Sequence, residues 1–298
     1  MVWVFIAILV VPGLLYIGTI LFFSLPERLY PRTYPVKSIC SKPSCARCST
    51  NQALLDRAKF FYDDVYNSND RLKQSLEASS NESEPLIFRL SGLLARPLWR
   101  SIEYGPQIST DIALLQENFP TIKLTALNLL NRHQNKWLRN SEPGGSNWFV
   151  FPLLNQGTWN DANLRYCPEV MAILFDLKSI MDKCVFGNIF FSILPPKTKI
   201  ATHRGPTNIR LRCHFCLETA RVKKECTLTV GDEGGEEKVH WTEREAFVFD
   251  DSFPHSVEST TKNEERIALI LDLWHPGISE NERYRLQRMF PDVPDPLA

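Results

Sequence analysis

Two histidines in the C-terminal half of the sequence stand where a short apolar run gives way to a turn. His203 is followed after one residue by Gly205-Pro206, and His255 comes after the turn residues 251–254. A neutral imidazole is the commonest metal ligand in proteins, but a single histidine near a turn is more often a capping or surface residue. The pair is a candidate metal site only if neighbouring residues support the same chemistry.

Basic residues lie on the segments next to these histidines. Residues 209–217 have the pattern of a strand, whose side chains alternate between two faces. One face is apolar, and the other carries Arg210, Arg212, His214 and Cys216. On a solvated sheet such a face is routine. At the mouth of a barrel it would form a carboxylate-binding wall, because guanidinium groups bind carboxylates bidentately.

A further arginine, Arg266, begins the strongly apolar run 266–274. Together with the histidines, these residues match what an iron oxygenase requires: imidazoles hold the metal, open coordination positions admit a cosubstrate and oxygen, and an arginine anchors the cosubstrate's far carboxylate. A zinc or cupin-type metal protein is the competing interpretation. Such a site would need a third or fourth protein ligand, and the turn after His203 supplies only Gly205.

The segments that carry these residues predict a β domain over residues 148–276. Many short strands at close spacing are typical of a β-sandwich or a small barrel. Apolar or alternating runs lie between turn signals at residues 148–154, 188–194, 209–217, 226–230, 245–249 and 266–274. A helix is expected over residues 168–183, and a C-terminal helix and tail over residues 277–298, with the helix itself over 279–289.

Residues 52–147 predict a helical region before the β domain. Apolar residues recur every three or four positions over residues 52–76 and again over residues 106–139. Pro120 should divide the second stretch into two helices, because a proline disrupts a helix interior. Residues 140–147 form a cluster of turn residues that separates this region from the β domain.

The N-terminus predicts a membrane anchor. Residues 2–25 contain no charged side chain, and a helix needs about 20 residues to cross a bilayer. The run is longer than the apolar core of a cleaved signal peptide, and no basic stretch precedes it. We therefore expect a single-pass transmembrane helix over residues 2–25, followed by a stalk over residues 26–51.

The stalk contains three cysteines, Cys40, Cys45 and Cys48. Cys45 and Cys48 have the spacing of paired zinc ligands, but no fourth ligand follows nearby. A disulfide with a spare thiol, or thiols without a role, is therefore the favoured interpretation.

The orientation of the anchor is open on the sequence alone. Basic residues after the span favour a cytosolic stalk, whereas the glycosylation sequon at Asn81 favours the lumen. Lys plus Arg and Asp plus Glu both number 34. This balance gives no reason to expect nucleic acid as a partner.

Several motifs resemble the aspartyl/asparaginyl β-hydroxylase family. They are residues 203–214 (HRGPTNIRLRCH), 249–255 (FDDSFPH) and 272–276 (DLWHP), together with Trp148 and residues 155–157 (NQG). They follow one another in the order that is typical of the family, and the resemblance covers roughly residues 148–276. The anchor and the cysteine-containing stalk are similar to those of the short membrane-anchored members.

The resemblance implies a mainly β fold with flanking helices, built on a double-stranded β-helix (jelly roll). It also implies Fe(II), 2-oxoglutarate as cosubstrate, and O2. By position, His203 and His255 match the iron ligands, and Arg266 matches the arginine that pairs with the far carboxylate of 2-oxoglutarate. Other positions of the cosubstrate pocket are matched by Trp148, Ser192, Arg212 and His214.

Gly205 stands where most 2-oxoglutarate oxygenases have an aspartate, as is typical of this family. Two protein ligands are therefore expected in place of the usual three. Asp250 or Asp251 could compensate by orienting a metal-bound water.

The resemblance also implies a function. The family hydroxylates the β-carbon of Asp or Asn in EGF-like domains within the secretory lumen. We therefore expect a protein or peptide substrate, and a catalytic domain on the lumenal side of the endoplasmic reticulum membrane. The competing hypothesis is a catalytically silent, membrane-anchored binding or scaffold protein that retains the fold. The intact candidates for metal and carboxylate binding favour the enzyme, because a decayed site would be expected to have lost Arg266 or a histidine.

Overall fold

The computed structural model describes residues 52–65, 70–79, 87–140 and 148–292. The predicted anchor (2–25), the stalk (26–51) and the sequon at Asn81 lie outside these residues. Within the described ranges, no helix combines the length and the apolar character needed to cross a membrane.

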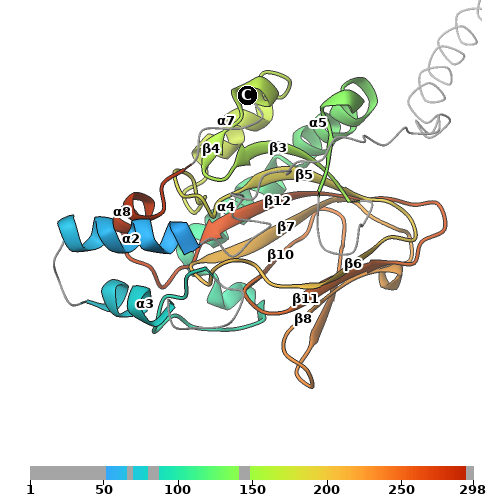
Figure 1. The fold of residues 1–298 in the computed structure, drawn as a ribbon. Coiled ribbons are helices and arrows are strands. Elements are labelled where there is room, and N and C mark those ends of the chain that lie inside the picture. Colours follow the sequence, from blue (N-terminus) through green and yellow to red (C-terminus); the bar gives the residue numbers. More distant parts are fainter. Residues whose placement is uncertain (1–51, 66–69, 80–86, 141–147, 293–298) are drawn as a thin grey trace, which may run out of the picture. The chain divides into compact units, whose positions relative to one another are not determined.

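Strands β5 to β12 are divided between two antiparallel sheets, and consecutive strands lie in different sheets except for β8 and β9. The larger sheet contains the order β10-β7-β12-β5, and the smaller sheet has the order β6-β11-β8-β9 (Figure 1). This is the strand order of a double-stranded β-helix, in which two sheets of a jelly roll face each other. The prediction of a mainly β fold with flanking helices is confirmed. The strands are β5 (Ile189–Leu194), β6 (Lys199–His203), β7 (Arg210–Glu218), β8 (Cys226–Val230), β9 (Glu237–His240), β10 (Ala246–Phe249), β11 (His255–Ser259) and β12 (Arg266–Trp274).

Four further strands extend the larger sheet. They are β1 (Leu98–Trp99), β2 (Leu138–Arg139), β3 (Phe149–Asn155) and β4 (Thr158–Trp159). β1 pairs with β10, and β2 pairs with β3. Both come from the region that was predicted to be helical, so residues on either side of position 148 share one sheet. The division into domains at this position stays a prediction.

The helices surround the larger sheet and its end. They are α2 (Gln52–Val65), α3 (Arg71–Ser79), α4 (Gly105–Glu117), α5 (Phe119–Arg132), α6 (Asp161–Leu164), α7 (Pro168–Asp176) and α8 (Glu280–Met289). The division near Pro120 is confirmed, because α4 ends at Glu117 and α5 begins at Phe119. The C-terminal helix is also confirmed, and Ser279 caps it in a capping box with Glu282.

Three predicted helices were too long. The helix predicted over 52–76 is two helices, because the Asp70 carboxylate accepts the N–H groups of Leu72 and Lys73 and so begins α3. The helix predicted over 168–183 ends at Asp176. Beyond it the Asp111 carboxylate accepts the N–H groups of Lys178 and Ser179 and holds that segment outside the helix. The helix predicted to reach residue 139 ends at Arg132, before β2.

The polar face of β7 was expected to lie either on a solvated sheet or at the mouth of a barrel, and the packing of the strand distinguishes the two. Helices α5 and α7 lie on one side of the larger sheet and the smaller sheet lies on the other (Figure 1). Phe215 meets Phe119 of α5 edge to face, with ring centroids 6.0 Å apart. Cys216 belongs instead to the apolar cluster between the two sheets. Arg210, Arg212 and His214 share the face of Cys216, so they point into the barrel.

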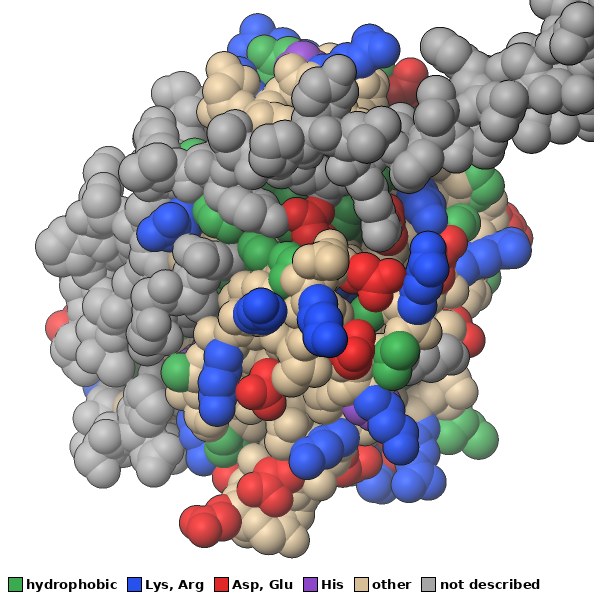
Figure 2. Space-filling model, turned by 90° about the vertical axis from the view of Figure 1, so that its right-hand side faces the viewer, with side chains coloured by type: hydrophobic (Ala, Val, Ile, Leu, Met, Phe, Trp, Pro, Cys, Tyr) green, Lys and Arg blue, Asp and Glu red, His purple; other side chains and the backbone are tan. Residues whose placement is uncertain are grey.

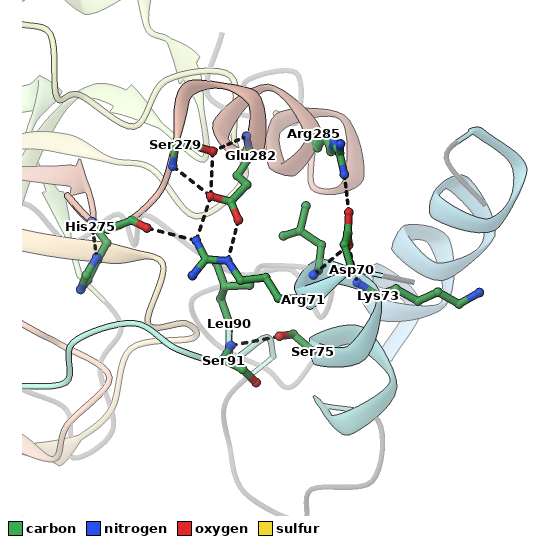
Figure 3. A network of polar contacts seen from close by, with 12 residues as sticks. Asp70, Arg71, Lys73, Ser75, Leu90, Ser91, His275, Ser279, Glu282 and Arg285 are labelled. Carbon is green, nitrogen blue, oxygen red and sulfur yellow. Dashed lines mark hydrogen bonds and ion pairs between the residues drawn. The ribbon is translucent and has the colours of Figure 1, made fainter. Parts of the chain in front are cut away.

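A second core joins the N-terminal helices to the C-terminal helix. α2 and α8 lie side by side (Figure 1), and Tyr62, Leu72 and Leu286 are buried in the same cluster. Ion pairs at the surface of this core connect α8 to the start of α3 (Figure 3). Arg71 pairs with both carboxylate oxygens of Glu282, at 2.6 and 2.8 Å, and Arg285 contacts Asp70 at 2.5 Å.

The described part of the chain contains five cysteines, all of them buried and free. They are Cys167, Cys184, Cys213, Cys216 and Cys226. Burial raises the pKa of the Cys184 and Cys213 thiols to about 12. These side chains therefore behave as small apolar groups at neutral pH.

His275, just after β12, joins the segment around Leu94 to the turn at Gly277. Its Nε2–H donates to the carbonyl of Leu94 at 3.0 Å, and its Nδ1 accepts the N–H of Gly277 at 2.9 Å. Only the neutral ring can make both bonds, because the second requires an unprotonated nitrogen. Burial also lowers the pKa of His275.

We expect the free energy of unfolding to fall as the pH drops below about 6.5. There the unfolded chain protonates His275 while the folded chain, with its lower pKa, does not. The unfolded state then binds more protons, and stability is lost toward acid. In His275→Gln, which keeps one donor and one acceptor, the loss between about pH 7.5 and about pH 5.5 should be smaller by about 1 kcal/mol. Urea titrations at both pH values measure this difference, and equal losses would contradict it.

Candidate metal and carboxylate site

The two predicted metal ligands lie together at one end of the smaller sheet. His203 is the last residue of β6 and His255 is the first residue of β11, and the two are partners in the antiparallel ladder. Their ring centroids are 4.2 Å apart. The fold therefore brings together two histidines that are far apart in the sequence, and neither sequence motif alone predicts this pairing.

Backbone carbonyls orient both rings. The Nδ1 atom of His203 lies 2.8 Å from the Ala201 carbonyl oxygen, and that of His255 lies 3.0 Å from the Phe253 carbonyl oxygen. A carbonyl can only accept, so each Nδ1 carries the proton and each Nε2 presents a lone pair. Burial, followed by the proximity of His203, lowers the pKa of His255 to about 3. Neutral imidazoles with a fixed tautomer suit metal coordination.

Gly205 leaves room for the carboxylate of Asp251. A β-carbon at position 205 would lie 2.5 Å from Cγ and 2.5 Å from Oδ2 of Asp251. The N–H of Gly205 also donates to the Asp251 carbonyl at 2.6 Å. The space that an acidic side chain at position 205 would enter is therefore occupied by an acid from the β10–β11 turn.

Asp251 belongs to a buried cluster of two arginines and two aspartates. Arg210 bridges Asp251 at 2.5 Å and Asp272 at 3.1 Å, and Arg212 bridges Asp272 at 2.9 Å and Asp251 at 3.3 Å. Burial alone would raise the pKa of Asp251, but Arg210 and Arg212 outweigh it and hold that pKa well below its usual range. The cluster thus pairs two guanidinium groups with two carboxyl groups.

Three predicted cosubstrate residues form a chain of contacts deeper in the barrel. The hydroxyl of Ser192 accepts the indole N–H of Trp148 at 2.7 Å and an N–H of Arg266 at 2.9 Å. Arg266 is 2 % exposed, and its Nε–H has no hydrogen-bond partner among the described atoms. Around it lie the Ser192 hydroxyl, the Cys226 thiol and the Trp241 ring. A buried cation with no acid among these neighbours is suited to bind an anion.

The model of the family described as Aspartyl/Asparaginyl beta-hydroxylase matches residues 116–276, more than half of the 298 residues. The chain belongs to the aspartyl/asparaginyl β-hydroxylase family. Human aspartate beta-hydroxylase domain-containing protein 2 is 32 % identical over 270 residues, which span 84 % of this chain and 70 % of the relative. Mouse aspartyl/asparaginyl beta-hydroxylase is 30 % identical over 202 residues, which span 67 % of this chain and 26 % of the relative.

Solved structures add less than these relatives do. An oxidoreductase of the 2OG-Fe(II) oxygenase family from Burkholderia pseudomallei aligns over 57 % of this chain and 91 % of its own, with 13 % identity and a TM-score of 0.39. A similarity this weak adds no evidence about the fold, which rests on the strand order of this β-hydroxylase family member.

His214 and Trp241 form an aromatic wall beside Arg266 in this β-hydroxylase family chain. The Arg266 guanidinium lies over the Trp241 ring at 5.0 Å, and the His214 ring stacks on the same indole at 5.7 Å. Burial lowers the pKa of His214 well below its ordinary value, and the charges of Arg266 and Arg212 add to the effect. The Trp241 indole N–H and the His214 Nδ1 have no hydrogen-bond partner in the described part of the chain.

A pocket opens beside His203, whereas His255 does not line it. It is lined by three of the predicted site residues, Trp148, His203 and Arg212, and also by Asn140, Arg210 and Asp251. His214, Ser192 and Arg266 lie outside its lining. No group of three or more His, Cys, Asp or Glu side chains in the described ranges is arranged to hold a metal ion. The two-histidine arrangement expected for the family is consistent with this.

Sequence reasoning missed Trp241 and the role of Arg210. A tryptophan in a polar segment between two short strands was the available signal for Trp241.

Sequence reasoning left Asp250 and Asp251 as alternative candidates for orienting a metal-bound water, and the structure distinguishes the two. The Asp250 carboxylate accepts the N–H of Ser252 at 2.9 Å, and burial raises its pKa to about 7. Only Asp251 lines the pocket beside His203.

Proposed function

We propose that the chain is an Fe(II)- and 2-oxoglutarate-dependent dioxygenase that hydroxylates Asp, Asn or another residue of a protein substrate. His203 and His255 would hold the metal through Nε2, since each Nδ1 is committed to a carbonyl. Arg266, Ser192 and Trp148 would bind the far carboxylate of 2-oxoglutarate. Membership of the β-hydroxylase family supports the reaction class.

The observation that carries this proposal is the environment of Arg266. The guanidinium is buried, its Nε–H has no partner in the described structure, and the neighbours named above (Ser192, Cys226 and Trp241) include no carboxylate. The Ser192 oxygen already accepts two hydrogen bonds, which leaves its own hydrogen as a donor. A carboxylate placed between these groups would accept from both and would pair the buried charge.

The residues of the chain have separable tasks in this reaction. When bound, Fe(II) with 2-oxoglutarate and O2 supplies the oxidising power that inserts a hydroxyl into a C–H bond. His203 and His255 would position the metal, and burial, which lowers the pKa of His255, keeps that imidazole neutral at physiological pH. The wall of His214 and Trp241 excludes water around Arg266, which strengthens its attraction for a carboxylate. The Arg–Asp cluster forms part of the pocket wall and orients Asp251 beside Gly205.

The substrate and location form part of the same proposal. The substrate class is a protein or peptide, with EGF-like domains among the candidates. The chain would be held at the endoplasmic reticulum membrane by residues 2–25, with the site on the lumenal side. The uncharged run and the sequon at Asn81 support this topology. Figure 2 shows Lys and Arg interspersed with Asp and Glu on the face it presents, so that face has no strong excess of one charge. Glycosidase sensitivity at Asn81 checks the orientation.

The test is 2-oxoglutarate binding by the Mn(II)-loaded full chain, measured by calorimetry, followed by succinate release with Fe(II) and a peptide library. We expect the unchanged chain to bind 2-oxoglutarate. Arg266→Ala should weaken that binding by about 100-fold or more, because two charge-assisted hydrogen bonds are lost, while metal binding persists. His203→Ala should lose the metal.

Arg221→Ala is the matched control, because this arginine is exposed and pairs with Glu264 at the surface. It should bind metal and cosubstrate as the unchanged chain does. Binding without succinate release for any peptide would favour the catalytically silent scaffold. An unchanged chain that binds no 2-oxoglutarate would reject the enzyme.

A further inference from the structure

The loop that follows His203 is attached to a segment far away in the sequence. Residues 87–91, called the strap here, run beside residues 206–208. The N–H groups of Ile87 and Phe88 donate to the Pro206 carbonyl at 2.8 and 3.2 Å, and Phe88 pairs with Thr207 in a parallel bridge. The strap therefore lies against the loop within five residues of the histidine.

The side chain of Asn208 connects the two segments by hydrogen bonds. Its Oδ1 accepts the Leu90 N–H at 2.8 Å, and its Nδ2 donates to the Leu90 carbonyl at 3.0 Å. The side chain is buried, with 6 % of Asn208 exposed. One amide thus satisfies both backbone groups of a single residue 118 positions away, which fixes the strap relative to the loop in two directions.

Helix α3 supports the strap from its other side. The buried hydroxyls of Ser75 and Ser79 accept the N–H groups of Ser91 at 3.0 Å and Arg89 at 3.1 Å. Figure 3 shows the Ser75–Ser91 contact beside the pairing of Arg71 with Glu282. Because α3 is also docked on α8, the strap rests on a helix that the C-terminal helix holds in place.

A site with two protein ligands depends strongly on such support. The loop begins directly after His203, and its Gly205 N–H donates to the Asp251 carbonyl. Without a third ligand, any freedom in the loop directly displaces half of the protein's coordination. Groups that orient metal ligands typically contribute about 10–100-fold in metal affinity.

We propose that Asn208 is a positioning residue for the metal site, and that α3, acting through the strap, contributes to metal retention. This inference rests on the proposed function only in requiring that His203 and His255 bind a divalent metal. It adds that a helix well before the β domain in the sequence, α3, contributes to the metal site without touching the metal.

The experiment is Mn(II) titration of the full chain, with free Mn(II) followed by electron paramagnetic resonance. Asn208→Ala should weaken Mn(II) binding by about tenfold. Asn208→Asp, which keeps an acceptor for the Leu90 N–H, should recover part of the loss. The double variant Ser75→Ala/Ser79→Ala leaves every loop contact in place and should weaken binding in the same direction.

Asn163→Ala is the matched control. Asn163 is also a buried amide, and its Nδ2 joins α6 to the Pro152 carbonyl of β3 at 2.8 Å. A comparable loss of stability with unchanged Mn(II) affinity is expected for it. If Asn208→Ala fails to fold, the serine double variant decides.

Unchanged Mn(II) affinity in Asn208→Ala would overturn the inference and leave the proposed function standing. If only the serine double variant folds, unchanged Mn(II) affinity in that variant would do the same. Equal weakening in Asn163→Ala would also overturn it, because the effect would then follow general stability. An unchanged chain that binds no Mn(II) would overturn both.

Discussion

Asp251→Ala is expected to lower the free energy of unfolding by about 3–5 kcal/mol. Asp251 is fully buried and contacts both Arg210 and Arg212. Its removal leaves the buried Arg210 guanidinium and the partly buried Arg212 guanidinium sharing the single carboxylate of Asp272, so one positive charge inside the barrel is left uncompensated. Urea denaturation at neutral pH, compared with the unchanged chain, measures the loss.

Asp232→Ala provides the matched comparison. Asp232 pairs with Arg204 at 3.1 Å, but its side chain is 63 % exposed. A surface pair of this kind contributes only about 0–1 kcal/mol. If the two alanine variants lose similar stability, the buried cluster does not carry the energy assigned to it.

Adding the missing acid at position 205 is expected to weaken metal binding. In Gly205→Asp the new β-carbon would enter the space of the Asp251 carboxylate, which is held by Arg210 and Arg212. Overpacking of this kind costs about 1–3 kcal/mol, and the two carboxylates would also repel each other. We expect Mn(II) affinity to fall by about tenfold, although a potential ligand has been added.

Exchange of the two residues tests the reason for this effect. Gly205→Asp/Asp251→Gly places one carboxylate in the same space from the loop that follows β6. It should recover both stability and Mn(II) affinity relative to the single variant. Tighter Mn(II) binding in Gly205→Asp alone would show that Asp251 does not block the position.

Sequence patterns predict best the strands that have several apolar residues and polar neighbours at both ends. β8 and β12 begin and end at the predicted residues, because polar residues mark both ends of each. β9 and β11 escape prediction because each is short and contains a single apolar residue. Their identity as strands comes from pairing with β8, which no local pattern records.

The candidate site was predictable in its parts and not in its assembly. The strand pattern placed Arg210 and Arg212 on one face, and that face points into the barrel. Their aspartate partner could not be inferred, since Asp272 lies opposite Arg212 only through the register of β7 and β12. Trp241 is similar, because its contact with Arg266 depends on how the two sheets close over each other.

The buried thiols described above are built-in chemical reporters of opening. Cys216 and Cys226 lie in the cluster inside the barrel, and Cys184 lies in the cluster shared by α2, α3 and α8. A thiolate reacts with alkylating reagents only once it is exposed and ionised, so labelling of each cysteine follows the opening of its own core. Labelling with mass-spectrometric readout would therefore tell whether the barrel and the helical core open together or separately.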